Sequence, residues 1–229
     1  MEPVSIVIPT FNEVDSIGHV LREFPIAYRA DLIVSDGGST DGTQDAARAA
    51  GARVIDAGRG YGRACAMGAA AAVPSSTVIV FLDGDGADRG DLIAQIAGLV
   101  LDDKKDFVLA TRTLGKRDKG AMNWHQVLAG RVAGMGMGSL YGVAYTDMCA
   151  FRAIRRTTLQ DLAMSEMTYG WNIEMQMKAA RARLRIAEVS LPYRCRIGGH
   201  SKVAGSMRGT LKAGSRIIST FVRVAAAKA

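Results

Sequence analysis

Two aspartates separated by one glycine, Asp83 and Asp85, directly follow a hydrophobic run at residues 78–82. The end of a strand would fix the first carboxylate, and Gly84 would let the backbone turn so that both carboxylates face one point. Carboxylate oxygens are the ligands that Mg²⁺ and Mn²⁺ prefer, and these ions keep positions free for phosphate oxygens. The pair therefore predicts a divalent metal site that receives a phosphorylated ligand, although an isolated Asp-Gly-Asp is more often an ordinary turn.

The surrounding sequence alternates short β-branched runs with alanine-rich stretches, the rhythm of parallel βαβ units. We expect strands at 5–8, 32–35, 53–55, 77–82 and 107–110, and helices at 14–24, 43–50, 61–72 and 91–101. Later elements are expected at 124–140 (helix), 149–154 (strand), 171–182 (helix) and 185–191 (strand). These elements predict an α/β fold, a Rossmann-like and mostly parallel open sheet with helices on both faces.

Polar loops follow the first four predicted strands, at 9–13, 36–43, 58–62 and 83–85. In open α/β sheets, ligands bind beyond the carboxyl ends of the strands, where loops converge and helix N-termini offer free N–H groups. The four loops therefore predict one site on one rim of the sheet.

Positive charge is concentrated near the C-terminus. The net charge is +7, to which residues 181–229 contribute +10 and the first 180 residues −3. From residue 206 onward, Arg208, Lys212 and Arg216 recur at four-residue spacing, with apolar residues elsewhere on the helical wheel. This pattern predicts a basic amphipathic helix at 206–229 after a single domain at 1–205. The helix either docks on the anionic cytoplasmic face of a membrane or packs with its polar face in solvent.

Composition argues against several classes of protein. The hydrophobic fraction of 48% is that of a globular chain. Cys65, Cys149 and Cys195 show no paired spacing for a disulfide framework or a zinc site, which fits a reducing cytoplasm. Neither a signal peptide nor an apolar run of about 18 residues is expected. After Tyr193 the basic tail contains only Phe221 as an aromatic residue, which argues against a nucleic-acid partner.

Together the motifs resemble those of family 2 glycosyltransferases with the GT-A fold. The resemblance rests on Val-Ile-Pro-Thr-Phe-Asn-Glu at 7–13, Asp-Gly-Gly-Ser-Thr-Asp-Gly-Thr at 36–43 and Asp-Gly-Asp at 83–85. Later segments are similar to the dolichyl and polyprenyl phosphate mannose synthase branch: Thr146-Asp147 with Phe-Arg-Ala at 151–153, and Tyr169-Gly170-Trp171 with Glu174. The resemblance spans nearly the whole chain and implies an enzyme, a hexosyltransferase.

This resemblance implies an inverting transfer of a sugar from a GDP- or UDP-sugar to a polyprenyl phosphate or similar acceptor. Asp83 and Asp85 would hold Mg²⁺ or Mn²⁺ at the diphosphate, and Gly60 and Gly62 would leave room for the donor. The acceptor or its phosphate would meet Tyr169, Trp171, Arg194, Arg196 and Lys202. The nucleotide sugar would contact Pro9, Thr10, Asn12, Glu13, Asp36, Gly37, Ser39, Gly60, Gly62, Asp83, Gly84 and Arg112.

Inversion needs an acceptor oxygen on the face of the sugar opposite the leaving group. A hydroxyl oxygen needs a base, for which Glu174 is the first candidate and Asp147 the second, whereas a phosphate oxygen needs little help. A salt bridge to Lys178, four residues on, is the structural alternative for Glu174. Ala87 departs from the branch, whose glutamine at this position supplies a further metal contact, so that Asp88 or water would have to replace it.

Other functions fit the sequence less well. A nucleotidyltransferase should carry a glycine-rich basic loop after its first strand, but the loop at 9–13 contains no glycine. A dinucleotide-binding oxidoreductase needs Gly-x-Gly-x-x-Gly at its first helix, whereas the glycine-rich loop at 58–62 follows the third strand. Two alternatives stay open: a catalytically silent binder of nucleotides or lipid phosphates at the membrane, and transfer to a small soluble hydroxyl acceptor. Donor base, sugar and oligomeric state are not readable from the sequence.

Overall fold

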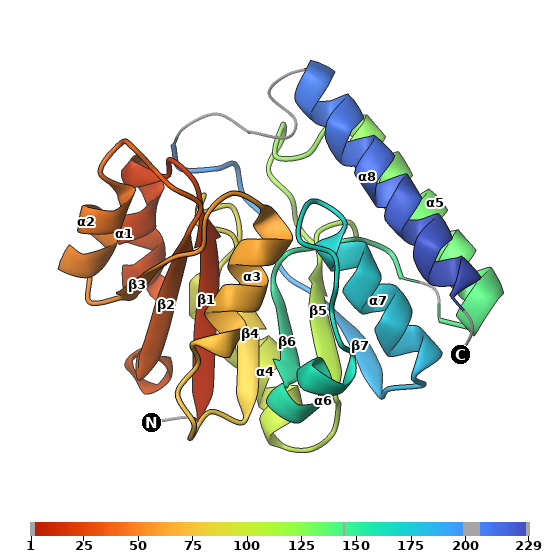
Figure 1. Ribbon diagram of the computed structural model, residues 1–229, viewed down its shortest axis with the longest axis horizontal. Coiled ribbons are helices and arrows are strands. Elements are labelled where there is room, and N and C mark those ends of the chain that lie inside the picture. Colours follow the sequence, from red (N-terminus) through yellow and green to blue (C-terminus); the bar gives the residue numbers. More distant parts are fainter. Residues whose placement is uncertain (1–2, 144, 199–206, 228–229) are drawn as a thin grey trace.

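A computed structural model describes residues 3–143, 145–198 and 207–227. It contains a seven-stranded sheet of order β3-β2-β1-β4-β6-β5-β7 with helices on both faces (Figure 1). All strand pairs are parallel except those of β6, which runs antiparallel to β4 and β5. The expected open, mostly parallel α/β sheet is confirmed. The strands are β1 (Val4–Thr10), β2 (Asp31–Asp36), β3 (Arg53–Asp56), β4 (Val78–Phe81), β5 (Phe107–Thr111), β6 (Arg152–Arg155) and β7 (Ile186–Ser190).

The central strands β1 and β4 are buried along their whole length because their sequences are almost entirely apolar. Successive side chains of a strand point to opposite faces, so Ile6 and Ile8 enter one apolar cluster and Val7 enters the other. In the parallel register, Thr10 of β1 lies beside Asp36 of β2. The carboxyl ends of the parallel strands therefore share one rim of the sheet.

Helices cover the two faces in separate sets. The first apolar cluster joins the sheet to α1 (Val14–Glu23), α2 (Thr43–Ala49) and α4 (Ala94–Leu101). The second joins it to α3 (Tyr61–Ala70), α6 (Arg156–Asp161) and α7 (Trp171–Arg181). Gly68 lets α3 approach β1, since a Cβ atom there would lie 2.2 Å from Cγ1 of Val7. Short 3-10 turns are η1 (Ile26–Tyr28) and η2 (Gly90–Leu92).

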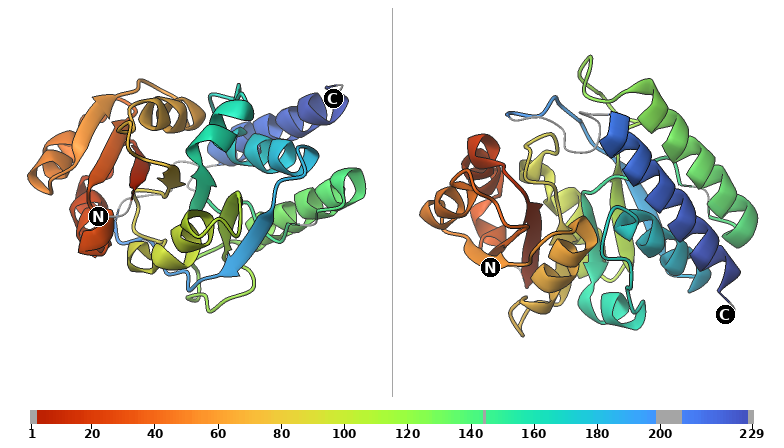
Figure 2. Two further views of the ribbon diagram at one scale, coloured as in Figure 1. Left: turned by 90° about the horizontal axis from the view of Figure 1, so that it is seen from below. Right: turned by 45° about the horizontal axis from the view of Figure 1, so that its top comes forward.

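Two long helices, α5 (Trp124–Tyr141) and α8 (Met207–Ala226), lie side by side outside α7 (Figures 1 and 2). Gly136 of α5 faces the ring of Phe221 of α8, and Ala213, Thr220 and Val224 of α8 are buried. Within the described residues, no helix is both long enough and apolar enough to cross a membrane.

Most predicted elements agree with the structure to within two residues at each end. Two differ further. The helix expected at 91–101 is divided into η2 and α4, and the strand expected at 149–154 is shortened to β6. Residues 149–151 lie outside the strand, and the backbone oxygen of Cys149 accepts a hydrogen bond from the buried side chain of Arg152.

Candidate active site

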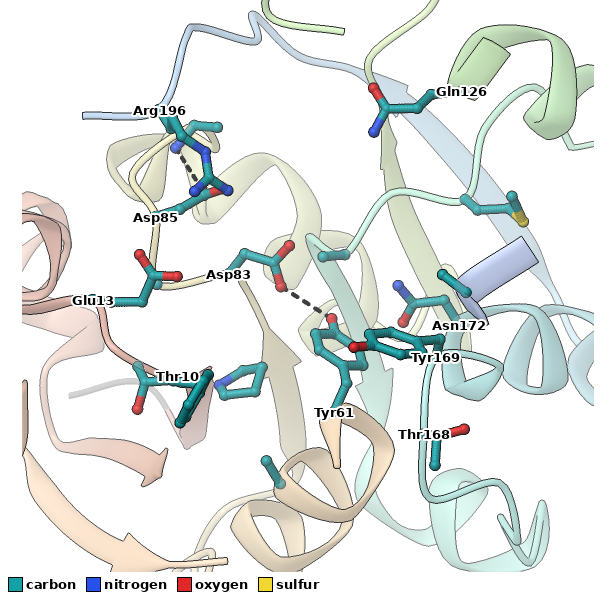
Figure 3. Close-up of a pocket in the computed structure, with 18 of the residues that line it drawn as sticks. Thr10, Glu13, Tyr61, Asp83, Asp85, Gln126, Thr168, Tyr169, Asn172 and Arg196 are labelled. Atoms are coloured by element: carbon teal, nitrogen blue, oxygen red, sulfur yellow. Dashed lines mark hydrogen bonds and ion pairs between the residues drawn. The ribbon is translucent and has the colours of Figure 1, made fainter. Parts of the chain in front are cut away.

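One cavity of 1310 Å³ opens at the carboxyl ends of the parallel strands (Figure 3). One side is formed by the loops after β1 to β4, and the other by the segment 168–172 and the helices α5 and α8. Of the residues predicted to bind donor, metal or acceptor, eleven line this cavity: Pro9, Thr10, Glu13, Gly37, Gly60, Asp83, Gly84, Asp85, Arg112, Tyr169 and Arg196.

Asp83 and Asp85 stand directly after β4 and face the cavity. The hydroxyl of Tyr61 donates to Asp83 at 3.1 Å. Asp85 accepts the backbone N–H of Ala87 at 2.9 Å and an Arg196 nitrogen at 2.7 Å. Burial and repulsion by the charge of Asp85 raise the pKa of Asp83 to about 6, and the charge of Glu13 adds to this effect.

This excess of negative charge fits a divalent cation. Two carboxylates close together offer hard oxygen ligands, and burial together with their mutual repulsion makes the charged form of Asp83 unfavourable without a cation. Among the described residues, no group of three or more His, Cys, Asp or Glu side chains is arranged to hold a metal. A cation here would thus take its remaining ligands from water and from phosphate oxygens.

Asp88 does not supply the missing contact at Ala87. Its side chain is buried outside the cavity lining and accepts the thiol of Cys149 at 3.7 Å. Burial, followed by the charge of Asp83, raises the pKa of Asp88 to about 8. A carboxyl group that is protonated at neutral pH is a poor metal ligand.

The loop after β2 supports the cavity from behind. Asp36 is buried, and its carboxylate accepts the backbone N–H groups of Gly38 and Ser39 and the hydroxyls of Thr10 and Ser39. Burial opposes ionisation, but these hydrogen bonds prevail and lower the pKa of Asp36. Asn12, with φ of 53°, accepts from the N–H of Thr40 at 3.0 Å. Asp36, Asn12 and Ser39 therefore shape the loops, and only Gly37 of this segment lines the cavity.

Gly60 and Gly62 have a different purpose from the one expected. A Cβ atom at Gly60 would lie 2.5 Å from the carbonyl oxygen of Met167, and one at Gly62 would lie 2.3 Å from that of Glu166. The backbone N–H of Gly62 also donates to Thr168 at 3.2 Å. The two glycines thus admit the segment 165–170. Gly60 also lines the cavity, whereas Gly62 lies outside the cavity lining.

The carboxylate of Asp147 forms an ion pair with Arg112. The guanidinium donates to both carboxylate oxygens, at 2.6 and 2.7 Å, and Asp147 is only 2% exposed. Burial opposes ionisation, yet the hydrogen bonds and charge of Arg112 lower the pKa of Asp147. The geometry therefore assigns Asp147 to the orientation of Arg112, which lines the cavity, and not to proton transfer.

Glu174 is likewise enclosed, and the geometry speaks against its expected role as a base. Its carboxylate accepts the Ser165 hydroxyl at 2.7 Å and the Glu166 N–H at 2.7 Å, and pairs with Lys178 at 3.1 Å. Burial is outweighed by these contacts, which lower the pKa of Glu174. The carboxylate lies outside the cavity lining, so the alternative of a Lys178 salt bridge describes the structure.

The expected acceptor residues divide into two sets. Tyr169 and Arg196 line the cavity. Trp171 is buried against Phe81, with ring centroids 6.1 Å apart, and Arg194 pairs with Glu23 at 2.7 Å, so neither reaches the cavity. Lys202 lies outside the described residues.

Several lining residues were not singled out as site residues in the sequence. They come from α3, α5, α7 and α8 and from loops between elements, and most lie far along the chain from the metal pair. Two signals were available in the sequence: the glycine-rich loop at 58–62, which presents Tyr61 to Asp83, and the basic spacing of Lys212 and Arg216. The polar members of this set are Arg59, Tyr61, Asn123, Gln126, Thr168, Asn172, Tyr193, Cys195, Lys212, Ser215 and Arg216.

The raised pKa of Asp83 predicts that the free energy of unfolding of the metal-free protein depends on pH. Between pH 3.8 and about 6 the folded chain holds the Asp83 proton more tightly than the unfolded chain, so the free energy of unfolding falls as pH rises through this window. Chemical denaturation of EDTA-treated Asp83→Asn should therefore show a gain of about 3 kcal/mol over the wild type at pH 7.5, narrowing to about 1 kcal/mol at pH 4.5.

Asp91→Asn provides a control of opposite sign, because the hydrogen bond from Arg89 lowers the pKa of Asp91. This variant should be less stable than the wild type at pH 7.5. A gain for Asp83→Asn that is equal at both pH values would contradict the raised pKa of Asp83.

Replacing Glu174 with glutamine should affect stability and leave the pH profile of the reaction rate unchanged. The new amide NH₂ would face the N–H of Glu166 or the Ser165 hydroxyl, so the free energy of unfolding should fall by about 2 kcal/mol. Chemical denaturation and rates measured across pH check both parts. A stable variant whose rate loses its dependence on a basic group would restore Glu174 as the base.

Comparison with known proteins is consistent with this geometry. The model of the family described as Glycosyl transferase family 2 matches residues 5–163, which include the strand-end loops and the Asp83–Asp85 pair. An uncharacterized glycosyltransferase of Mycobacterium tuberculosis strain H37Rv is 34% identical over 214 residues, covering 92% of this chain and 94% of that protein.

Two relatives have more specific names. A dolichyl-phosphate hexose transferase of Haloferax volcanii is 34% identical over 202 residues, covering 86% of this chain and 85% of that protein. An undecaprenyl-phosphate mannosyltransferase of Micrococcus luteus is 30% identical over 223 residues, covering 89% of this chain and 88% of that protein.

Among solved structures, glucosyl-3-phosphoglycerate synthase of Mycobacterium tuberculosis, in complex with Mn²⁺, UDP and glucosyl-3-phosphoglycerate, shares the fold. The TM-score is 0.75 at 22% identity, and the match covers 99% of this chain and 81% of that one. The fold is therefore that of GT-A glycosyltransferases, and the chain belongs to glycosyl transferase family 2.

Proposed function

We propose that this enzyme moves a sugar, with inversion, from a nucleotide diphosphate sugar to a polyprenyl phosphate or similar lipid phosphate, assisted by Mg²⁺ or Mn²⁺. One observation carries the proposal. The cavity that contains Asp83 and Asp85 is walled on its far side by α5 and α8, whose outer surfaces are apolar and free of acidic residues.

The donor side is suited to a nucleoside diphosphate. Thr10, Gly37 and Arg59 line the cavity at the ends of β1 to β3, next to the metal pair. Bound at Asp83 and Asp85, a divalent ion would stabilise negative charge on the departing diphosphate without proton transfer. Arg112, held by Asp147, adds a fixed positive charge to the same cavity.

The acceptor side carries an amphipathic surface. On α5, Trp124, Leu128, Val132 and Met135 are 76, 51, 54 and 63% exposed, and their spacing of four, four and three residues places them on one face. Neither helix contains Asp or Glu. Exposed apolar side chains grouped on a helix without acidic residues are typical of contact with an anionic membrane surface.

On α8 the same pattern recurs. Leu211, Ile218 and Val222 are 68, 67 and 59% exposed and follow at spacings of seven and four residues. Lys212 and Arg216 of the same helix line the cavity. A phosphate head group would therefore enter beside these two cations while its apolar chain stays at the membrane.

A phosphate acceptor also agrees with the state of the two candidate bases. Asp147 and Glu174 are buried and fully engaged, so neither is placed to take a proton from a hydroxyl acceptor. A phosphate oxygen is already ionised at neutral pH and needs no such base. The names of the Haloferax and Micrococcus relatives, which act on dolichyl and undecaprenyl phosphates, support the same acceptor class.

A small soluble phosphorylated acceptor is the second candidate. It is favoured by the shared fold of glucosyl-3-phosphoglycerate synthase, solved with phosphoglyceric acid, since the cavity cations would suit any phosphate. It leaves the apolar surface of α5 and α8 without a purpose, and for this reason the lipid acceptor is preferred.

The donor and the metal are tested by thermal shifts with UDP, GDP and their common sugar conjugates, each with and without Mn²⁺. A ligand at about 100 times its Kd should stabilise the wild type by about 2.7 kcal/mol. With one nucleotide the shift should require Mn²⁺ and vanish in Asp85→Ala. A shift without sugar transfer to either polyprenyl phosphate or a small phosphorylated acceptor would instead indicate a catalytically silent binding protein.

The acceptor side is tested with vesicles of phosphatidylglycerol and phosphatidylcholine. The double variant Trp124→Ser, Leu128→Ser removes two exposed apolar side chains and should weaken vesicle binding about tenfold or more in a co-sedimentation assay. Ile26→Ser is the matched control, because Ile26 is 78% exposed but lies in η1, away from both helices. Equal binding of wild type and double variant would favour the soluble acceptor.

A further inference from the structure

Arg196 occupies the carboxylate that the proposed metal needs. Its guanidinium donates to Asp85 at 2.7 Å and lines the cavity (Figure 3). The following residue fixes this position, because the N–H of Ile197 donates to the backbone oxygen of Asp85 at 3.0 Å. The side chain of Ile197 also lies against Gly86, where a Cβ atom would be 2.4 Å away. The arginine is thus held in place by its own segment.

The arginine is only partly satisfied there. Among the described residues, its second terminal nitrogen is buried and has no hydrogen-bond partner. Leaving a buried charged donor unpaired is costly, so this nitrogen favours an additional oxygen ligand inside the cavity. Asp85 does not provide it: one of its oxygens accepts from the other terminal nitrogen of Arg196, and the second accepts the N–H of Ala87.

A divalent cation and the guanidinium compete at this point. Both seek the Asp85 carboxylate, and their like charges repel strongly at such a short separation in a partly buried site. The negative charge that a metal would neutralise is, in the metal-free protein, partly neutralised by Arg196. When the metal binds, the oxygens that can satisfy the displaced guanidinium are those of the donor diphosphate.

We propose that Arg196 is an internal counter-ion that competes with the divalent metal for Asp85 and moves to the donor diphosphate once the metal binds. The inference rests on the proposed metal-dependent donor site and adds a coupling to it, in which Arg196 opposes the binding of the metal and favours the binding of the nucleotide. It requires that removing the charge of Arg196 raises the affinity for the metal and lowers the affinity for the nucleoside diphosphate.

The test compares Arg196→Met with the wild type. Methionine keeps the unbranched apolar stem and removes the charge. Without nucleotide, the variant should bind Mn²⁺ about tenfold more tightly, measured by the electron paramagnetic resonance signal of free Mn²⁺, because a charge-assisted hydrogen bond no longer competes. With saturating Mn²⁺, its affinity for the nucleoside diphosphate selected by the thermal-shift panel should be about tenfold weaker by calorimetry.

Two further variants separate competition from general electrostatics. Arg59→Met removes the same charge from the same cavity, but Arg59 stacks 3.7 Å from the centroid of the Phe11 ring and forms no ion pair among the described residues. It should change Mn²⁺ affinity less than about threefold. Arg196→Lys retains the charge and should lie between wild type and Arg196→Met.

The outcomes are distinct. If Arg196→Met binds Mn²⁺ no more tightly than the wild type, or if Arg59→Met tightens Mn²⁺ binding as much as Arg196→Met does, the proposal that Arg196 is a counter-ion is wrong. Either result leaves the metal-dependent function intact. Mn²⁺ binding absent from the wild type and gained by Arg196→Met supports the counter-ion. Absence from both proteins overturns the inference together with the metal-dependent function.

Discussion

The repulsion between two carboxylates at the end of β4 is the constraint around which the site is arranged. Asp83 and Asp85 are brought together by a buried strand and one glycine, and the cost appears as the raised pKa of Asp83. The surrounding groups respond to this charge: Tyr61 donates a hydrogen bond, and Arg196 forms an ion pair. A site with this much uncompensated negative charge is prepared for a cation before any ligand arrives.

Three other buried carboxylates, in contrast, are stabilised by the hydrogen bonds that they accept, and they hold loops in place. Asp36 closes the loop after β2, Asp147 orients Arg112, and Glu174 gathers the N–H groups at 165–166. Each has its pKa lowered because hydrogen bonds outweigh burial. These three carboxylates build the framework around the site, whereas Asp83, whose pKa is raised, faces the cavity.

The sequence was a good guide wherever local chemistry decides structure. The parallel strands, the loops after them and the position of Asp83 and Asp85 at the rim follow from β-branched runs that end in glycine and aspartate, because those patterns act over a few residues. The roles of Glu174 and Asp147 did not follow. Their acidity suggested proton transfer, but their partners lie on separate segments, and only the folded chain shows that each is enclosed. The purpose of Gly60 and Gly62 was missed for the same reason, since the segment they admit is about 100 residues away.

The strand order has a consequence for how the enzyme is made. The half of the sheet formed by β3, β2, β1 and β4 is encoded without interruption by the first 81 residues, and the metal pair follows at once. The opposite wall is assembled from distant segments and ends with α8, the last element of the chain. The donor half is therefore synthesised well before the segments that form its partner wall. A nascent chain thus carries the metal pair and the strand-end loops while it still lacks the residues of α8, so the complete cavity can form only late in synthesis.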